Sequence, residues 1–141
     1  MDRIEPDGAS FITKEGVKMK IRESEEMYLE TILVLKNRLS FVRSIDIAEE
    51  LGYSRPSVSR AVGLLSRKEY IKISDNGEIT LTELGEQRAK EIYERHEVIT
   101  YFLMELGADV DMAEDNACRI EHVISPELFD LLKKRRDQKQ G

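Results

Sequence analysis

The chain has 141 residues and a formal net charge of −6, and its length suits one compact domain or two small ones that share a core. Its single Cys excludes an intramolecular disulfide, and no stretch is apolar over the roughly 18 residues that a membrane-spanning helix needs. The N-terminus lacks the apolar segment of a secretion signal, which indicates a soluble cytoplasmic protein with no membrane partner.

Residues 1–22 mix Gly, Pro, Asp and Lys without periodicity, which predicts a flexible leader. Ser24 then predicts the N-cap of a helix of about 15 residues, with apolar positions at Tyr28, Leu29 and Ile32 on its inner stripe. This helix is expected to open a first domain over residues 23–82.

Two short helices joined by a tight turn are expected next. Ser44 predicts the cap of a helix over residues 45–51, and Gly52 is well placed to end it. Ser54 predicts the cap of the following helix, because Pro56 lies in the first turn that tolerates proline.

A change of periodicity after this helix predicts a hairpin. Residues 70–73 and 78–81 are typical of strands, and Asn76-Gly77 is a strong turn signal between them. Two helices, a turn and a hairpin together predict a winged helix-turn-helix.

The second helix and the hairpin are candidates for contact with DNA. Residues 52–72 carry a local charge of +4 in an otherwise acidic chain. Arg pairs with guanine edges, and Ser and helix N-termini bind phosphate. The expected contacts are Ser54, Arg55, Pro56, Ser57, Ser59 and Arg60 of the helix, with Lys72 and Asn76 of the wing. A winged helix used for protein contacts remains the alternative.

Residues 83–141 are expected to form a second, helical domain. Thr82 predicts the cap of a helix over residues 83–106, with Gly107 at its end, and Asp111 with Glu114 resembles the capping box of a helix to about residue 124. Ser125-Pro126 predicts a last helix before a polar tail from Lys133. Residues 83–130 carry a charge of −9, and the apolar positions of residues 112–132 predict a dimer.

Three potential metal ligands are clustered in this second domain. Cys118, Glu121 and His122 stand at i, i+3 and i+4, which places a thiolate, a carboxylate and an imidazole on one helix face. They include the only Cys and one of the two His of the chain. The pattern predicts a transition-metal site.

The sequence resembles the diphtheria toxin repressor family, whose members are iron- or manganese-dependent transcriptional repressors. The resemblance rests on residues 117–123 (ACRIEHV), residues 26–29 (EMYL) and residues 54–59 (SRPSVS), and it runs from about residue 24 to residue 132. It implies a mainly α fold, with a winged helix-turn-helix followed by a helical metal-binding and dimerisation domain. At this length we expect the short form without the SH3-like domain of longer members.

The resemblance also implies a ligand set. A Met or Asp of the first helix joins the dimerisation-helix ligands in this family, so Met27 would join Cys118, Glu121 and His122. A second site uses a His that matches His96. Iron-type members add to it positions that are Thr100 and Glu114 here, whereas manganese-type members use a Glu that matches Glu30. The chain therefore mixes features of the two types.

The ligand types favour Fe(II), with Mn(II) second, and Co, Ni and Zn also suit them. We expect a repressor that controls metal homeostasis by binding operator DNA as a homodimer when metal is loaded, rather than an enzyme with an organic substrate. One alternative is a metal-independent winged-helix regulator with Cys118 as a redox sensor. The other alternative is a Cys–His enzyme that uses Cys118 with His122 or His96, although no substrate-binding segment is visible.

Overall fold

A computed structural model describes residues 14–140, with only the course of the backbone for residues 14–23. Its elements are α1 (Lys14–Arg38), α2 (Ser44–Leu51), α3 (Arg55–Arg67), β1 (Ile71–Ile73), β2 (Ile79–Leu81), α4 (Glu83–Glu105), α5 (Val110–Ile120) and α6 (Pro126–Gln140). The order confirms the predicted fold, a winged helix-turn-helix followed by a helical region. None of the described helices is both long enough and apolar enough to cross a membrane.

The first helix is longer than its sequence signals predict. It begins at Lys14, so Ser24 lies inside it and the predicted N-cap is wrong. The predicted leader is likewise wrong for residues 14–22, which are helical, while residues 1–13 lie outside the described part of the chain. The physical reason is that residues 17–23 contain no Gly or Pro and are rich in Lys, Arg and Glu, which favour a continuing helix.

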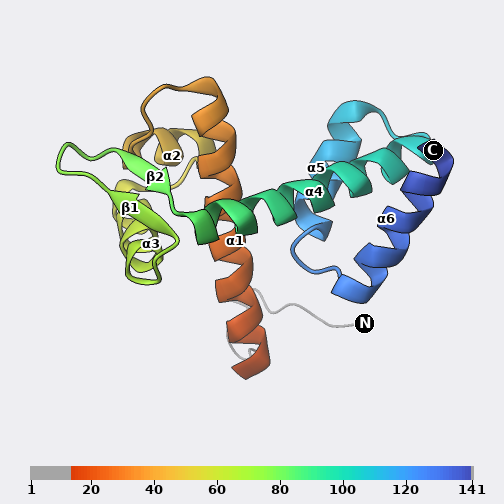
Figure 1. Cartoon of the computed structure of the whole chain (residues 1–141), viewed down its shortest axis with the longest axis horizontal. Helices are drawn as coiled ribbons and strands as arrows, with labels where there is room; N and C mark the ends of the chain where they lie inside the picture. The colour runs from red at the N-terminus through yellow and green to blue at the C-terminus, as the bar shows by residue number, and fades with distance from the viewer. Residues whose placement is uncertain (1–13, 141) are drawn as a thin grey trace.

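The core of the N-terminal half lies between α1, α2, α3 and the hairpin (Figure 1). Its fully buried side chains include Leu29 and Ile32 of α1, Ile47 of α2 and Val58 of α3. Gly52 ends α2 in the left-handed conformation at φ 70°, as predicted. The predicted cap at Ser44 is wrong, because Arg43 precedes the helix and its backbone N–H donates to the Asp46 carboxylate at 2.8 Å.

The hairpin has a longer turn than the Asn-Gly pair predicts. β1 and β2 are antiparallel, with Lys72 opposite Thr80. The backbone N–H of Gly77 donates to the Ser74 carbonyl at 2.9 Å, and Gly77 has a φ of 88° whereas Asn76 does not have a positive φ. Gly77 alone therefore supplies the left-handed residue of this turn.

Helix α4 connects the two halves of the molecule. It starts beside the hairpin, crosses α1 and ends among α5 and α6 (Figure 1). The Thr82 hydroxyl caps it as predicted by accepting from the Gly85 N–H at 3.1 Å, and Gly107 follows its end with a φ of 110°. One rigid element thus contacts both the DNA-binding half and the C-terminal helices.

The C-terminal helices depart from three predicted boundaries. Asp109, not Asp111, caps α5 by accepting from the Met112 N–H at 2.8 Å, and the helix ends at Ile120 rather than near residue 124. Helix α6 continues through the predicted polar tail to Gln140. Lys133 and Lys139 in that stretch form ion pairs of 2.9 and 2.6 Å with carboxylates on α4, which helps to hold the tail as a helix.

Candidate metal centre and nucleic-acid interface

A pocket of about 590 Å³ lies where α1, α4 and α5 meet. Five of the seven predicted metal ligands line it: Met27 and Glu30 from α1, His96 from α4, and Glu114 and Cys118 from α5. Asp111 and Asp115 also line it, so the opening is strongly acidic. The tertiary fold therefore brings together ligand types that are far apart in the sequence.

The other two predicted ligands lie buried beside this pocket. Glu121 and His122 follow the end of α5, and the Glu121 N–H still donates to the Ala117 carbonyl at 2.9 Å, which keeps them on the helical path. Donor atoms of Glu30, Glu121 and His122 lie within 4.8 Å of one another. Two ligands of one small divalent cation are separated by about 3–4.5 Å, given metal–ligand bonds of about 2.0–2.3 Å. These three residues are therefore close to the spacing that a shared cation requires.

His96 joins the cluster through a carboxylate. Its Nδ1 lies 2.8 Å from Oε1 of Glu121, and Oε2 of Glu121 lies 3.2 Å from Nε2 of His122. Glu121 thus bridges the two imidazoles. The hydrogen bond with Glu121 raises the pKa of His96, and the charge of Glu114 raises it further, although partial burial acts in the opposite direction. Glu114 lines the pocket from an exposed position.

Burial and charge shift the protonation of this cluster. Burial and the neighbouring Glu121 raise the pKa of Glu30 to about 9, so at neutral pH the Glu30 carboxyl is protonated and donates to Glu121. Burial lowers the pKa of His122, but hydrogen bonds to Glu121 and Glu26 outweigh it and raise the value to about 9. Burial raises the pKa of Glu121, yet its hydrogen bonds with His122, His96 and Glu30 lower it to about 2. Protons therefore occupy positions that a cation would need.

The residues present fit a divalent cation. Among the polar side-chain atoms of the described residues, Oγ1 of Thr100, Oε2 of Glu121 and Nε2 of His122 are buried without a well-formed hydrogen bond, and the last two have only their 3.2 Å ion pair with each other. Such atoms are costly unless an ion or a water satisfies them. The other ring nitrogen, Nδ1 of His122, lies 3.1 Å from Oε1 of Glu26, an arrangement that would keep the proton on Nδ1 and direct Nε2 to a metal once the Nε2 proton is displaced. Oxygen, nitrogen and sulfur donors together suit first-row transition metals.

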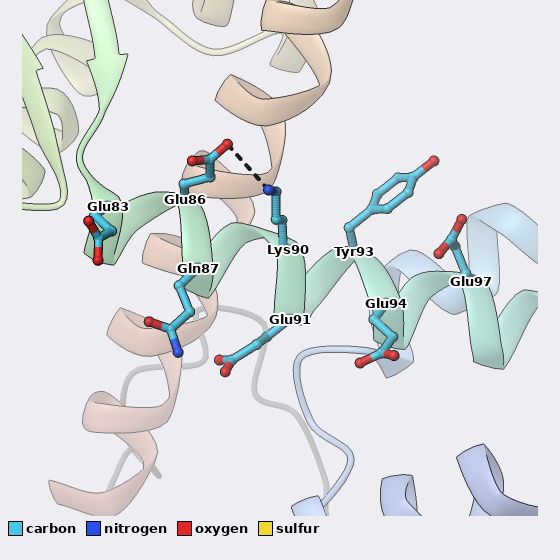
Figure 2. A pocket seen from close by; sticks show the side chains of 8 residues that line it. All are labelled: Glu83, Glu86, Gln87, Lys90, Glu91, Tyr93, Glu94 and Glu97. Atoms are coloured by element: carbon cyan, nitrogen blue, oxygen red, sulfur yellow. Dashed lines mark ion pairs between the residues drawn. The ribbon is translucent and has the colours of Figure 1, made fainter.

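A second acidic hollow lies along α4, but it does not combine ligand types from several helices as the first pocket does. Figure 2 shows its lining side chains, which come from one helix alone: Glu83, Glu86, Gln87, Lys90, Glu91, Tyr93, Glu94 and Glu97. Glu86 pairs with Lys90 at 3.4 Å, and Glu94 pairs with Lys133 of α6 at 2.9 Å. Much of the acidic excess of the second half is therefore ordinary helix surface.

The predicted DNA contacts lie on α3 and the hairpin, on the side of the molecule away from α5 and α6 (Figure 1). The Ser54 hydroxyl accepts from the Ser57 N–H at 3.3 Å and so caps α3, as predicted. Seven of the eight residues are exposed and Ser57 is half-buried: Ser54, Arg55, Pro56, Ser57, Ser59, Arg60, Lys72 and Asn76. The N-terminal half of α3 is thus free to enter a groove.

Two residues that contact the proposed ligands, Glu26 and Tyr53, are not among the ligands predicted from the sequence. Glu26 is buried, and its Oε1 lies 3.1 Å from Nδ1 of His122. Its spacing from Glu30, i and i+4, would have indicated it, because two like charges so placed repel unless a cation or proton intervenes. The Tyr53 hydroxyl lies 3.7 Å from Sδ of Met27, a long-range contact with no sequence signal.

Comparison with known proteins places both halves of the chain in one family. Residues 20–78 match the family model for the iron-dependent repressor N-terminal DNA-binding domain, and residues 82–138 match the model for its metal-binding and dimerisation domain. An uncharacterised HTH-type transcriptional regulator of Methanocaldococcus jannaschii is 35% identical over 113 residues, which are 79% of this chain and 90% of that protein. The chain belongs to the iron-dependent repressor family.

Two further relatives show the same relationship. The transcriptional regulator MntR of Escherichia coli O157:H7 is 32% identical over 79% of this chain and 72% of its own length. The diphtheria toxin repressor of Corynebacterium diphtheriae is 31% identical over 75% of this chain, and the match spans 47% of that protein. The family resemblance inferred from the sequence motifs is confirmed.

Solved structures agree with the fold. The manganese regulator SloR has a TM-score of 0.71 and 29% identity, covering 80% of this chain and 53% of its own. A manganese-dependent transcriptional repressor in complex with manganese has a TM-score of 0.72 and 25% identity, covering 79% of this chain and 51% of its own. This chain therefore spans about half the length of these two solved family members.

Proposed function

We propose that this chain is a cytoplasmic transcriptional repressor that binds operator DNA as a homodimer when it is loaded with Fe(II) or Mn(II), and so controls metal homeostasis. The observation that carries the proposal is the meeting of half-buried Glu30 with buried Glu121 and His122 in one cluster beside Cys118, Met27 and His96. Family membership supports the repressor class.

The position of the cluster explains why metal would control DNA binding. Helix α1 packs its Leu29 and Ile32 into the core that also holds α3, and its Met27 and Glu30 line the pocket beside that core. The remaining ligands come from α4, from α5 and from the two residues directly after α5. A bound cation supplies the positive charge that lets these carboxylates ionise together. The side chains themselves then hold α1 against α5 and set the direction of α3.

The expected metal follows from the ligand types. A Cys and a Met beside imidazole and carboxylate favour Fe(II), and the carboxylates at Glu30 and Glu121 also suit Mn(II). Co, Ni and Zn are expected to bind in vitro for the same reason.

The surface expected to form the dimer lies at the end of α4 and the start of α5. Leu106 is 84% exposed and Met112 is 57% exposed, and both line an apolar hollow of about 590 Å³ with Leu103 and Ile120. A second copy of the chain would cover this surface. Two-fold symmetry would then present two α3 helices to half-sites about one turn of DNA apart.

The redox alternative is disfavoured by the environment of Cys118. Cys118 is exposed to solvent, but partial burial of its thiol and the charges of Glu121 and Glu30 raise the thiol pKa to about 11, whereas a reactive cysteine needs thiolate. The same protonated thiol argues against a Cys–His enzyme. The relatives that match are transcriptional regulators rather than enzymes.

The test is selection of operator sequences followed by binding measurements. Random 30-base-pair duplexes would be selected on the full chain with Mn(II), and affinity for the selected duplex measured with Mn(II), with Fe(II) under anaerobic conditions, and with a chelator. We expect affinity to fall on chelation, and unchanged affinity would refute metal control. Cys118→Ser should weaken metal binding, whereas normal metal binding with lost oxidant sensitivity would restore the redox alternative.

Arg60→Ala tests the DNA surface, with Lys90→Ala as the matched control. Both variants remove one exposed positive charge, but Lys90 lies in the acidic hollow of α4. Arg60→Ala should weaken DNA binding with unchanged Mn(II) affinity, and Lys90→Ala should change neither. Equal effects of the two variants would refute a contact between α3 and DNA.

A further inference from the structure

A continuous series of polar contacts leaves the proposed metal site and ends at the far end of α3. It starts at Nδ1 of His122, which lies 3.1 Å from Oε1 of Glu26. Oε2 of Glu26 lies 3.7 Å from Nη2 of Arg88. Arg88 is thus the first group beyond the carboxylate that holds His122.

Arg88 of α4 also contacts two groups on other elements. Its Nη1 donates to the Tyr70 hydroxyl at 2.7 Å and to Oε1 of Glu25 at 3.3 Å, and its guanidinium lies 5.1 Å from the centre of the Tyr70 ring. The other oxygen of Glu25 pairs with the Lys68 ammonium. One guanidinium therefore bridges α1, α4 and the start of the wing.

The end points belong to the elements that would read DNA. Lys68 is the C-cap of α3, and Tyr70 precedes β1 directly. The Tyr70 carbonyl accepts from the Thr82 N–H at 3.0 Å, which ties the wing to the start of α4. A shift of Arg88 would be transmitted to the junction between the recognition helix and the wing.

Burial makes this network sensitive to any loss of charge. Glu25 is only 8% exposed and Glu26 only 5%, and the Arg88 side chain is 20% exposed. Buried carboxylates need a paired cation, and a planar guanidinium satisfies several acceptors in fixed directions where an ammonium does not. Arg88 is the one cation among the described residues that pairs with both carboxylates.

We propose that Arg88 is a positioning residue that couples the metal site to the recognition helix. It holds Glu26 in the orientation that fixes His122 for the metal, and through Glu25 and Tyr70 it holds the C-terminal end of α3. This inference rests on the proposed function. It assigns the coupling to contacts that lie outside the ligand set.

Two consequences separate this role from simple stabilisation. Loss of Arg88 frees Glu26, so Mn(II) binding should weaken by about 10–100-fold, as for other groups that orient metal ligands. It also disconnects α3, so saturating Mn(II) should no longer order the recognition helix. A merely structural residue would lower stability without removing the response of α3 to metal.

The experiment compares the full chain with Arg88→Met, and with Lys90→Met as a control of equal charge change on the same helix. Mn(II) affinity is measured from the loss of the hexaaqua Mn(II) signal in electron paramagnetic resonance. Amide hydrogen exchange of α3, β1 and α5 is then followed with chelator and with saturating Mn(II). Neither measurement needs an operator sequence.

We expect Mn(II) to slow exchange in α3, β1 and α5 of the wild type and of Lys90→Met. In Arg88→Met, saturating Mn(II) should slow exchange in α5 but not in α3. If Arg88→Met does not fold, Glu25→Gln takes its place, because it leaves the contact between Glu26 and His122 intact. That variant should bind Mn(II) like the wild type yet lose the response of α3.

The outcomes that overturn the inference are specific. Retention of the metal-dependent slowing in α3 of Arg88→Met, or of Glu25→Gln where the first variant is unfolded, would refute it and leave the proposed function standing. Unchanged amide exchange in α3 of the wild type on addition of Mn(II) would also refute the inference and leave the proposed function standing. A wild type that binds neither Mn(II) nor Fe(II) would overturn the proposed function and this inference together.

Discussion

Replacing Gly85 by Ala should destabilise the protein by forcing α4 away from the wing. Gly85 lies in the first turn of α4, and a Cβ built there would lie 2.0 Å from the Tyr70 carbonyl oxygen and 2.9 Å from its carbon. These are backbone atoms and cannot rotate away. The start of α4 must therefore shift by more than about 1 Å to reach normal contact.

The expected magnitude follows from three contributions. Overpacking against backbone costs about 1–3 kcal/mol, and loss of the Thr82 cap costs about 1 kcal/mol. The gain in helix propensity from Gly to Ala offsets about 1 kcal/mol. The net loss is about 2 kcal/mol, which corresponds to a fall in melting temperature of about 4–8 °C at this chain length.

Gly63→Ala is the matched control within α3. A Cβ at Gly63 would meet only the Arg67 guanidinium at 3.7 Å, an ordinary contact, so this variant should gain up to about 1 kcal/mol from helix propensity. Urea unfolding of both variants at one protein concentration, with chelator present, measures the two free energies of unfolding. A stabilised Gly85→Ala would refute the close approach of α4 to the wing.

Three further outcomes follow from the metal cluster and the apolar surface. Glu30→Gln copies a protonated carboxyl and should change the free energy of unfolding of the metal-free protein by less than about 1 kcal/mol. Glu121→Gln removes an ionised group and should lower that free energy by about 3 kcal/mol. Urea unfolding measures both, and equal losses would contradict these protonation states. Because the pKa values of Glu30 and His122 are raised to about 9, a cation must displace their protons. Mn(II) affinity should therefore rise from about pH 6 to pH 9 in calorimetric titrations, and a flat profile would count against this ligand set. Combining Leu106→Glu with Met112→Glu should give monomers by sedimentation velocity with unchanged helix content, and a persistent dimer would place the interface elsewhere.

Local rules explain which parts of the fold were predictable. Gly52 ends α2 and Ser54 caps α3, in each case through a contact within four residues. Local sequence rules therefore identify both ends of the turn. Local rules gave wrong helix boundaries where two neighbouring residues could each cap a helix, and where contacts with distant residues accompany its extension. Asp109 rather than Asp111 caps α5, and α6 extends because its lysines reach carboxylates on α4.

The candidate site divides in the same way. The sequence by itself determined which residue types are present and that Cys118, Glu121 and His122 follow one helical path, because that spacing is local. Only the tertiary structure decided that Glu30 meets them, that Glu26 holds His122 and that Arg88 links both to the recognition helix. The contacts of Glu26 with His122 and with Arg88 join residues more than 60 positions apart. They depend on the crossing of α1 and α4, which no local periodicity encodes.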